Sequence, residues 1–221
     1  MVKYKAIFFD LDGTLLNTLD DLTDSVNHTL ATFGYPVKTR EEIRNAIGNG
    51  ARLLIARSLP EGTSEERITE LHEAYHQWYS AHSQIKTAPY DGILPLLDEL
   101  HRRGIQMAVV SNKGDAQVKP LVKSYFPQID LAVGERKDFG KKPCPDSVLD
   151  VMKQLNATPE TTLYVGDSEV DVLTAQNAGI PAVAVTWGFR SKELLSSHNP
   201  DYLIDSPQEL LKPFQLLHRS Q

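Results

Sequence analysis

The chain has 221 residues, enough for one ordinary domain with a small inserted unit. Its net charge of −6 disfavours nonspecific binding to nucleic acids or anionic membranes, and no stretch reaches the roughly 18 apolar residues of a membrane span. Cys144 is the only cysteine, which excludes an intrachain disulfide, and the N-terminus does not resemble a secretory signal. We therefore expect a cytoplasmic protein without nucleic-acid or membrane partners, and the composition leaves a monomer and a homodimer equally open.

The first apolar run, "KAIFFD" at residues 5–10, predicts a buried strand. It leads into "DLDGT", where Asp10 and Asp12 are two residues apart and face the same side of an extended chain. Gly13 lets the backbone turn tightly after them. Neighbouring carboxylates repel unless a cation or separate hydrogen bonds distinguish them, and hard oxygen ligands suit Mg²⁺. A merely charged turn after a strand is the alternative interpretation.

Residues 18–83 carry no strand signal and have helical patterns throughout. The stretches "TREE" and "TSEE" both match the capping box that starts a helix, and a long amphipathic stretch follows the second. A small helical unit therefore interrupts the chain after its first strand. We expect this helical unit at 17–87, inserted into a core formed by 1–16 and 88–221, with the last residues, 214–221, prone to fray.

From about residue 90 onward, short strand signals alternate with helical patterns. Apolar runs rich in Val, Ile and Ala predict strands at 105–111, 130–134, 162–167, 181–188 and, more weakly, 201–205. Helical patterns occupy 91–104, 147–156 and 169–179. Because the strand signals do not alternate between apolar and polar residues, the strands should be buried on both faces of a parallel sheet. The sequence thus predicts an α/β fold with a doubly wound, Rossmann-like core.

Polar clusters follow three of the later strands. They are Ser111 and Asn112, then the lysine pair Lys141 and Lys142 in "GKKPCPD", then Asp167, Ser168 and Asp171 in "GDSEVD". Ligands of open parallel sheets bind beyond the carboxyl ends of the strands, so these side chains should converge with the first-strand carboxylates. Each cluster alone is compatible with a turn, a solvated lysine pair or a helix cap. Together they indicate Mg²⁺-assisted phosphoryl transfer.

The order of the motifs DxDGT, Ser-Asn, Lys-Pro-x-Pro and GDS-x-x-D resembles that of the haloacid dehalogenase superfamily of phosphatases. The resemblance spans nearly the whole chain, and the helical insert is similar to the family's cap. It implies a phosphomonoester hydrolase in which Asp10 is the nucleophile and forms an aspartyl-phosphate. Asp12 would be the general acid and then the general base. Asp10, Asp12 (through its backbone carbonyl) and Asp167 would bind Mg²⁺.

The same resemblance implies roles for the other motif residues. Ser111, Asn112 and Lys142 would hold the phosphoryl oxygens, and Lys142 would also stabilise the transition state. Asp171 and Ser168 would lie behind these groups, with Asp171 orienting the lysine. A sugar-phosphate mutase, a pyrophosphatase or a nucleotidase would carry the same core motifs. A receiver-like switch that accepts a phosphoryl group is a non-enzymatic alternative, although its acceptor Asp lies on a later strand.

Several stretches are similar to phosphoglycolate phosphatases, namely "GNGARLLI", "KPCPDSVLDVMKQL", "TWGF" and "PDYLIDSPQELL". This similarity implies a small phosphorylated metabolite as the substrate, with 2-phosphoglycolate as the first expectation. Gly48, Asn49 and Gly50 would read the far end of the substrate through backbone N–H groups, or else form a turn between two cap helices. The roles of Arg52 and Trp187 stay open between substrate contact and ordinary packing.

Overall fold

The structure is a computed structural model that describes residues 4–212. The chain divides into two compact units. One contains the chain up to Leu15 and from Pro89 onward, and the other is Leu16–Ala88. The expected fraying of 214–221 lies outside the described residues. Within residues 4–212, no helix combines the length and the apolar character needed to cross a membrane.

The first unit is built on a parallel sheet with the strand order β5-β4-β1-β6-β7-β8. Its strands are β1 (Ala6–Phe9), β4 (Gln106–Gly114), β5 (Leu131–Glu135), β6 (Thr162–Gly166), β7 (Ala182–Val185) and β8 (Tyr202–Ile204). Strand β1 lies between β4 and β6, with Ala6 opposite both Gln106 and Thr162. The strand order reverses at β1, where ligands of such sheets bind. This topology confirms the predicted doubly wound α/β fold.

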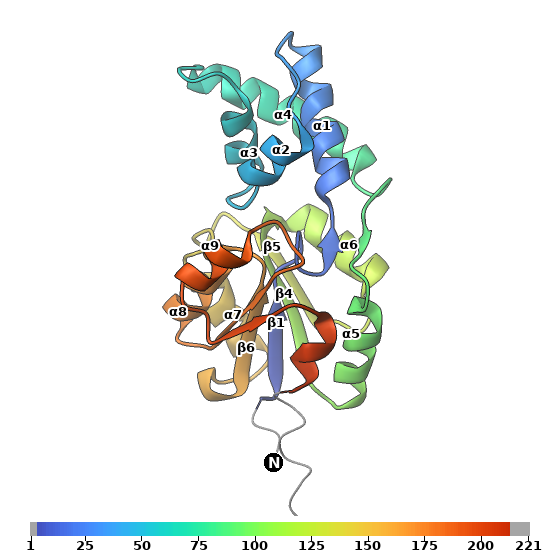
Figure 1. The fold of residues 1–221 in the computed structure, drawn as a ribbon, viewed down its shortest axis with the longest axis vertical. Coiled ribbons are helices and arrows are strands. Elements are labelled where there is room, and N and C mark those ends of the chain that lie inside the picture. The colour runs from blue at the N-terminus through green and yellow to red at the C-terminus, as the bar shows by residue number, and fades with distance from the viewer. Residues whose placement is uncertain (1–3, 213–221) are drawn as a thin grey trace, which may run out of the picture. The chain divides into compact units, whose positions relative to one another are not determined.

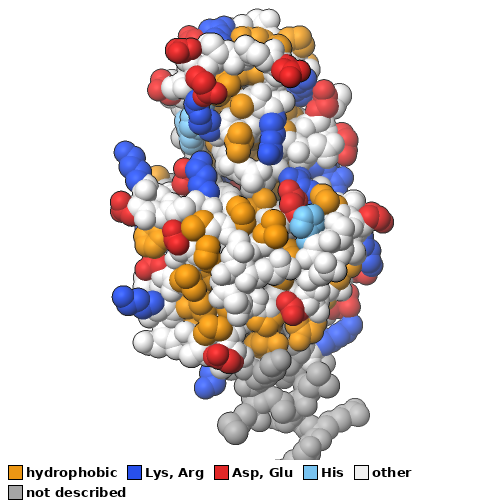
Figure 2. All heavy atoms as spheres, turned by 90° about the vertical axis from the view of Figure 1, so that its left-hand side faces the viewer, with side chains coloured by type: hydrophobic (Ala, Val, Ile, Leu, Met, Phe, Trp, Pro, Cys, Tyr) orange, Lys and Arg blue, Asp and Glu red, His pale blue; other side chains and the backbone are white. Residues whose placement is uncertain are grey.

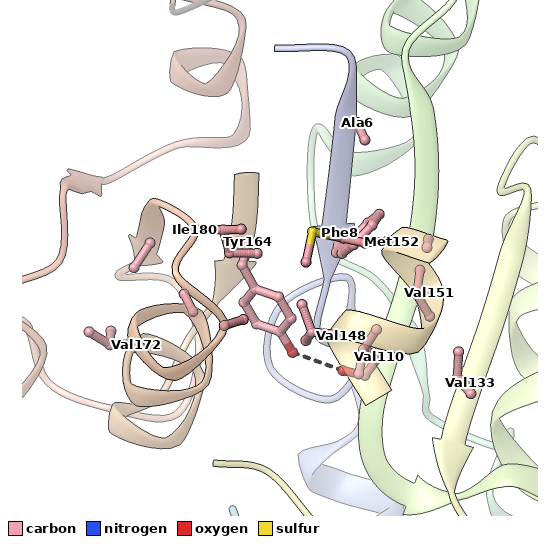
Figure 3. Packing of buried hydrophobic residues seen from close by; sticks show 14 of the residues in the cluster. Ala6, Phe8, Val110, Val133, Val148, Val151, Met152, Tyr164, Val172 and Ile180 are labelled. Carbon is pink, nitrogen blue, oxygen red and sulfur yellow. Dashed lines mark hydrogen bonds between the residues drawn. The ribbon is translucent and has the colours of Figure 1, made fainter. Parts of the chain in front are cut away.

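Helices cover both faces of this sheet (Figure 1). They are α5 (Ile93–Arg102), α6 (Asp115–Tyr125), α7 (Asp146–Gln154), α8 (Glu169–Ala178) and α9 (Lys192–Ser197), with short 3₁₀ turns at Pro159–Thr161 and Pro207–Leu211. On one face, Phe8 and Tyr164 pack against α7 residues such as Val148 and Met152 (Figure 3). Full burial of such side chains contributes about 1.5–3 kcal/mol each. Helix α6, which the sequence patterns did not single out, carries Pro120 within it.

The central strands end in an irregular, polar stretch. Pairing of β1 with β4 stops at Phe9 and Val109, and the pairing of β4 with β5 shifts register between Val110 and Gly114. The three residues Ser111, Asn112 and Lys113 therefore extend β4 beyond its regular pairing. Their side chains are available for contacts other than the packing of the sheet.

The second unit, Leu16–Ala88, is helical. Its elements are β2 (Leu16–Asn17), α1 (Leu19–Thr32), α2 (Arg40–Ala46), α3 (Ala51–Ser58), α4 (Glu65–His82) and the start of β3 (Ala88–Pro89), which pairs with β2. The capping box of Thr39 and Glu42 is present as predicted. In "TSEE" the cap lies one residue later than expected, because Ser64 Oγ accepts the N–H of Arg67.

A buried carboxylate fastens the return segment of the helical unit to α1. Asp21 is 2% exposed and accepts the backbone N–H groups of Ile85, Lys86 and Thr87 over 2.8–3.1 Å. These backbone hydrogen bonds stabilise the ionised form of the carboxylate. On the face drawn in Figure 2, acidic and basic side chains are intermixed rather than gathered by sign.

Candidate active site

The DxDGT motif begins where β1 ends. Asp10 directly follows Phe9, and its N–H donates to Val165 O over 2.9 Å. Gly13 turns the chain with a φ of 90°, and a Cβ atom there would lie 2.4 Å from Asp167 Oδ2. Because that space admits no side chain and other residues avoid this conformation, the position needs glycine. The turn brings the end of β1 against the end of β6.

Asp167 is the most enclosed of the carboxylates at this edge, with 1% of its surface exposed. Thr14 Oγ1 donates to its Oδ1 over 3.2 Å, and the Phe189 N–H donates to its Oδ2 over 2.7 Å. A Cβ atom on Gly188 would lie 2.3 Å from Asp167 Cβ and 2.4 Å from Gly13 O. Gly188, in the "TWGF" stretch, is therefore a site residue that the sequence did not identify.

Lys142 contacts two carboxylates and a hydroxyl, which come from three separate parts of the chain. Its ammonium donates to Asp171 Oδ1 over 2.7 Å and to the Tyr164 hydroxyl over 3.0 Å, and it lies 2.9 Å from Asp10 Oδ1. The lysine side chain is only 4% exposed. Because these contacts hold it on several sides, the ammonium is a fixed point charge beside Asp10.

Asn112 contacts the backbone of this lysine. The Lys142 N–H donates to Asn112 Oδ1 over 2.8 Å, and Asn112 Nδ2 donates to Lys142 O over 3.0 Å. The sequence assigned this amide to the phosphoryl oxygens, but here both ends of the amide bind the Lys142 backbone. Ser111 is 7% exposed, and its hydroxyl accepts the N–H of Lys113 over 3.3 Å.

Asp171 has two tasks, of which the resemblance implied only the second, the orientation of Lys142. Its Oδ2 accepts the N–H and the hydroxyl of Ser168 over 3.1 and 2.6 Å, which forms the capping box of α8. Its Oδ1 binds Lys142. The helix cap therefore includes Asp171 itself, and the same carboxylate holds the lysine.

The carboxylates fit a hard divalent cation. Asp10, Asp167 and Asp171 each offer an oxygen, and these oxygens lie within 4.8 Å of one another. Both oxygens of Asp171 are engaged by Lys142 and Ser168. Asp10 Oδ1 is buried and, beside its ion pair, accepts no directed hydrogen bond from the described residues. Oxygen ligands with a free lone pair are what Mg²⁺ or Ca²⁺ prefers.

The electrostatics of the site favour added positive charge. Burial raises the pKa of Asp10 to about 6; Lys142 opposes this shift, while Asp171 and Asp12 add to it. Burial, Asp171 and Asp10 raise the pKa of Asp167 well above its usual range. Burial alone would lower the pKa of Lys142, but Asp10 and Asp171 outweigh it and raise that pKa well above its usual range. A cation bound here would relieve the repulsion among the carboxylates.

Two further residues were not identified from the sequence. Lys113 donates to both carboxylate oxygens of Asp12, over 3.2 and 3.0 Å, with its own side chain 6% exposed. Its only sequence signal is a basic residue directly after Ser111 and Asn112. The buried Tyr164 hydroxyl donates to Val110 O over 2.9 Å (Figure 3). It therefore connects Lys142 to the end of β4.

Gly48, Asn49 and Gly50 belong to the unit Leu16–Ala88 and form the turn between α2 and α3. Helix α3 begins directly after Gly50, so both the expected turn and the helix start are present. Asn49 Oδ1 accepts from Arg57 Nη2 over 2.9 Å. Recognition of substrate by this turn stays a prediction.

The two residues with open roles have contacts of their own. Arg52 Nη1 donates to Thr69 Oγ1 over 3.0 Å, and its Nη2 pairs with Glu65 within the helical unit. Trp187 is half-buried, and its Nε1 donates to Thr14 O over 3.0 Å. Trp187 therefore supports the DxDGT turn.

The chain matches known proteins over most of its length. Residues 7–185 match the model of the haloacid dehalogenase-like hydrolases. A phosphoglycolate phosphatase from Pseudomonas aeruginosa is 37% identical over 217 residues, which cover 94% of this chain and 78% of that protein. One from Vibrio parahaemolyticus is 33% identical and is matched over 94% of this chain and 95% of that protein.

Solved structures of related proteins have the same fold over nearly the whole chain. A predicted phosphoglycolate phosphatase from Haemophilus somnus superposes with a TM-score of 0.89 at 27% identity, covering 96% of this chain and 98% of that one. A hydrolase of the haloacid dehalogenase-like family from Streptococcus pneumoniae gives a TM-score of 0.87 at 26% identity, covering 97% and 100%.

Three observations define the class of protein as a hydrolase with a doubly wound core. They are the parallel sheet, the carboxylates and lysine at its carboxyl edge, and the match to the family model. The chain belongs to the haloacid dehalogenase-like hydrolase family. Within that family it is a phosphatase, and the relatives that it resembles are named phosphoglycolate phosphatases.

Proposed function

We propose that the chain is a Mg²⁺-dependent phosphomonoester hydrolase that forms an aspartyl-phosphate on Asp10. The observation that carries this proposal is the state of Asp10 Oδ1. It is buried, accepts no directed hydrogen bond from the described residues and lies 2.9 Å from the Lys142 ammonium. A carboxylate oxygen in this state has a lone pair available, which suits it to bind a metal ion or to attack phosphorus.

The carboxylates of Asp10 and Asp167 and the backbone carbonyl of Asp12 are the proposed holders of Mg²⁺. The cation, when bound, neutralises charge on the carboxylates and on the phosphoryl oxygens. Thr14 and the Phe189 N–H fix the Asp167 carboxylate in place for this task.

In the first step an Asp10 oxygen attacks phosphorus. The bond from phosphorus to the ester oxygen breaks, and Asp12 gives its proton to that leaving oxygen, which departs as an alcohol. Lys142 and the Ser111 hydroxyl balance the charge on the phosphoryl oxygens. Asn112 acts by positioning, because its amide fixes the backbone of Lys142.

In the second step a water molecule attacks the phosphorus of the aspartyl-phosphate. Asp12, now ionised, takes a proton from that water, and the bond from phosphorus to the Asp10 oxygen breaks. Inorganic phosphate leaves, and Asp10 returns to a carboxylate. Asp171 keeps Lys142 in place through both steps, because its own position is fixed by the helix cap with Ser168.

The proposed substrate is 2-phosphoglycolate. The relatives from Pseudomonas aeruginosa and Vibrio parahaemolyticus that carry this activity in their names support the choice. We further propose that Leu16–Ala88 is a cap domain and that its turn at residues 48–50 contributes to substrate selection. A cytoplasmic location stays a prediction, which the single cysteine supports because it fits a reducing compartment.

A panel of phosphorylated compounds tests the proposal. Phosphate release is measured with and without Mg²⁺ for 2-phosphoglycolate, sugar phosphates, nucleotides and pyrophosphate. The expected result is Mg²⁺-dependent turnover with the highest kcat/KM for 2-phosphoglycolate. A higher kcat/KM for pyrophosphate, a nucleotide or a sugar phosphate would refute 2-phosphoglycolate as the substrate. A single phosphoryl transfer without sustained phosphate release would refute the proposal that the chain is a phosphatase.

A further inference from the structure

The two buried lysines of the site have different surroundings. The Lys142 ammonium contacts Asp171, Tyr164 and Asp10, and so is held by groups of the chain on several sides. Lys113 extends from the irregular end of β4, and its ammonium donates to both oxygens of Asp12. Lys113 is thus the basic group placed beside the residue proposed to protonate the leaving group.

The position of Lys113 defines which part of a substrate it meets. In the proposed reaction Asp12 reaches the ester oxygen of the substrate. The Lys113 ammonium contacts both Asp12 oxygens, so it is close to the carbon atoms bonded to that ester oxygen. The phosphoryl group itself is on the side of Asp10 and Lys142. Lys113 therefore faces the alcohol part of the substrate.

The charge balance of the site determines what that alcohol part should carry. Four carboxylates, those of Asp10, Asp12, Asp167 and Asp171, gather at this edge with the two lysines. A second anionic group on the substrate would be repelled by them unless a cation faced it. Because the Lys113 side chain is 6% exposed, water screens such a contact little.

We infer that Lys113 is a specificity-determining residue whose ammonium binds a carboxylate attached close to the leaving oxygen of the phosphomonoester. The inference rests on the proposed function, since it assigns Asp12 to the leaving group. In 2-phosphoglycolate a single methylene carbon separates the ester oxygen from the carboxylate. The substrate carboxylate replaces Asp12 as the partner of Lys113, which leaves the Asp12 carboxyl group facing the ester oxygen. A lysine ammonium is a compact charge and changes partner without a fixed planar geometry.

The test compares two substrates in the wild type and in Lys113→Met, which keeps the length of the side chain and removes its charge. The substrates are 2-phosphoglycolate and ethyl phosphate, which lacks the carboxylate. Losing a hydrogen bond between charged groups should lower kcat/KM for 2-phosphoglycolate about 10- to 100-fold relative to ethyl phosphate. Any effect of the variant on Asp12 is shared by both substrates and cancels in this ratio.

Two controls separate this role from a structural one. Inorganic phosphate has no alcohol part, so its inhibition constant should change less than about twofold in Lys113→Met if the phosphoryl site is intact. Lys113→Arg retains the charge and should keep most of the preference for 2-phosphoglycolate. An equal loss for both substrates, or an unchanged ratio, overturns the inference.

The wild-type panel distinguishes failure of the inference from failure of the proposed substrate. If pyrophosphate gives the highest kcat/KM, 2-phosphoglycolate is the wrong substrate, and a carboxylate is also the wrong partner for Lys113. If the best substrate carries no anion besides the transferred phosphoryl group, the inference about Lys113 is overturned and the phosphatase activity is not.

Discussion

The pKa values of carboxyl groups shift in opposite directions in two regions of the molecule. One region is the carboxyl edge of the parallel sheet, and the other is the helix starts of the unit Leu16–Ala88. In the helical unit, bonds from the Thr39 N–H and then the Thr39 hydroxyl lower the pKa of the exposed Glu42. At the sheet edge, burial raises the pKa of Asp10 to about 6 and that of Asp167 well above its usual range. The first arrangement stabilises the ionised form, and the second opposes it.

The difference shows which charges serve folding and which serve chemistry. A capping carboxylate stabilises the fold in the ionised state that it has at neutral pH. A buried cluster of like charges destabilises the folded state and is retained where a ligand restores the balance. Substitutions in the two regions should therefore affect stability and activity in different ways.

Replacement of the nucleophile should give the largest effect. Asp10→Asn removes the attacking oxygen and should lower kcat by at least about 10⁴-fold. Because the same change removes a buried charge next to Asp171 and Asp167, the metal-free variant should be more stable than wild type at about neutral pH, by on the order of 1–3 kcal/mol. Urea unfolding and phosphate release measure the two effects. Turnover near the wild-type rate would exclude Asp10 as the nucleophile.

The two lysines of "GKKPCPD" form a matched pair. Lys142→Met should lower kcat about 10²- to 10³-fold and destabilise the fold by about 3 kcal/mol or more, since it leaves buried carboxylates unpaired. Lys141 is half-exposed and pairs with Glu135 over 3.0 Å, so Lys141→Met should change stability by less than about 0.5 kcal/mol. Equal effects in the two variants would show that the structure assigns the wrong lysine.

The hydroxyl behind Lys142 should have a smaller effect. Tyr164→Phe removes a bond to Val110 O and a partner of Lys142, and should cost about 1–3 kcal/mol of stability. A less firmly held lysine should lower kcat roughly tenfold with KM little changed. Tyr4→Phe, which alters a hydroxyl paired with Tyr202 and away from the site, is the control and should leave kcat unchanged. A change in KM alone would contradict a positioning role.

Stabilisation by Mg²⁺ should depend on pH. Since the pKa of Asp10 is raised from 3.8 to about 6, the stability contributed by its protonated form is fully present below about pH 4 and is lost as pH rises through 6. Mg²⁺ binds the ionised carboxylate, so its effect grows over the same window. Calorimetry should show a larger increase in Tm on adding Mg²⁺ at about pH 7.5 than at about pH 5. Equal increases at both pH values would contradict binding at Asp10.

The smallest effect is expected in the helical unit. Thr39→Ala removes the capping box of α2 and should lower the free energy of unfolding by about 1 kcal/mol. Because the lost bonds are exposed and structural, kcat should stay within about twofold of wild type. A large loss of turnover would mean that the start of α2 contributes to the reaction.

The sequence predicted the fold because strand and helix signals are local. Runs such as "TLYVGD" and "PAVAVTWG" are short and apolar. The first matches β6 to within one residue, and the second contains β7, which ends three residues earlier than predicted. It also predicted that the DxDGT motif, Lys142 and Asp167 would meet, because parallel strands bring their carboxyl ends to one edge. These expectations needed only periodicity and topology.

The partners of individual side chains were not predictable in this way. The bond of Asn112 to the Lys142 backbone, and that of Lys113 to Asp12, join residues far apart in the chain. They depend on the register shift after Val110, which no local pattern specifies. Gly188 was missed for the same reason, since only the position of Asp167 shows that a side chain does not fit there.

The most direct test of the account is a search for the covalent intermediate. The best substrate of the panel is labelled with ³²P at the phosphoryl group, mixed with Asp12→Asn to slow hydrolysis of the intermediate, and quenched in acid. We predict labelled protein, with the label on the peptide that contains Asp10, and no label in the double variant that carries both Asp10→Asn and Asp12→Asn. Turnover without labelled protein, or label that persists in the double variant, would contradict the account.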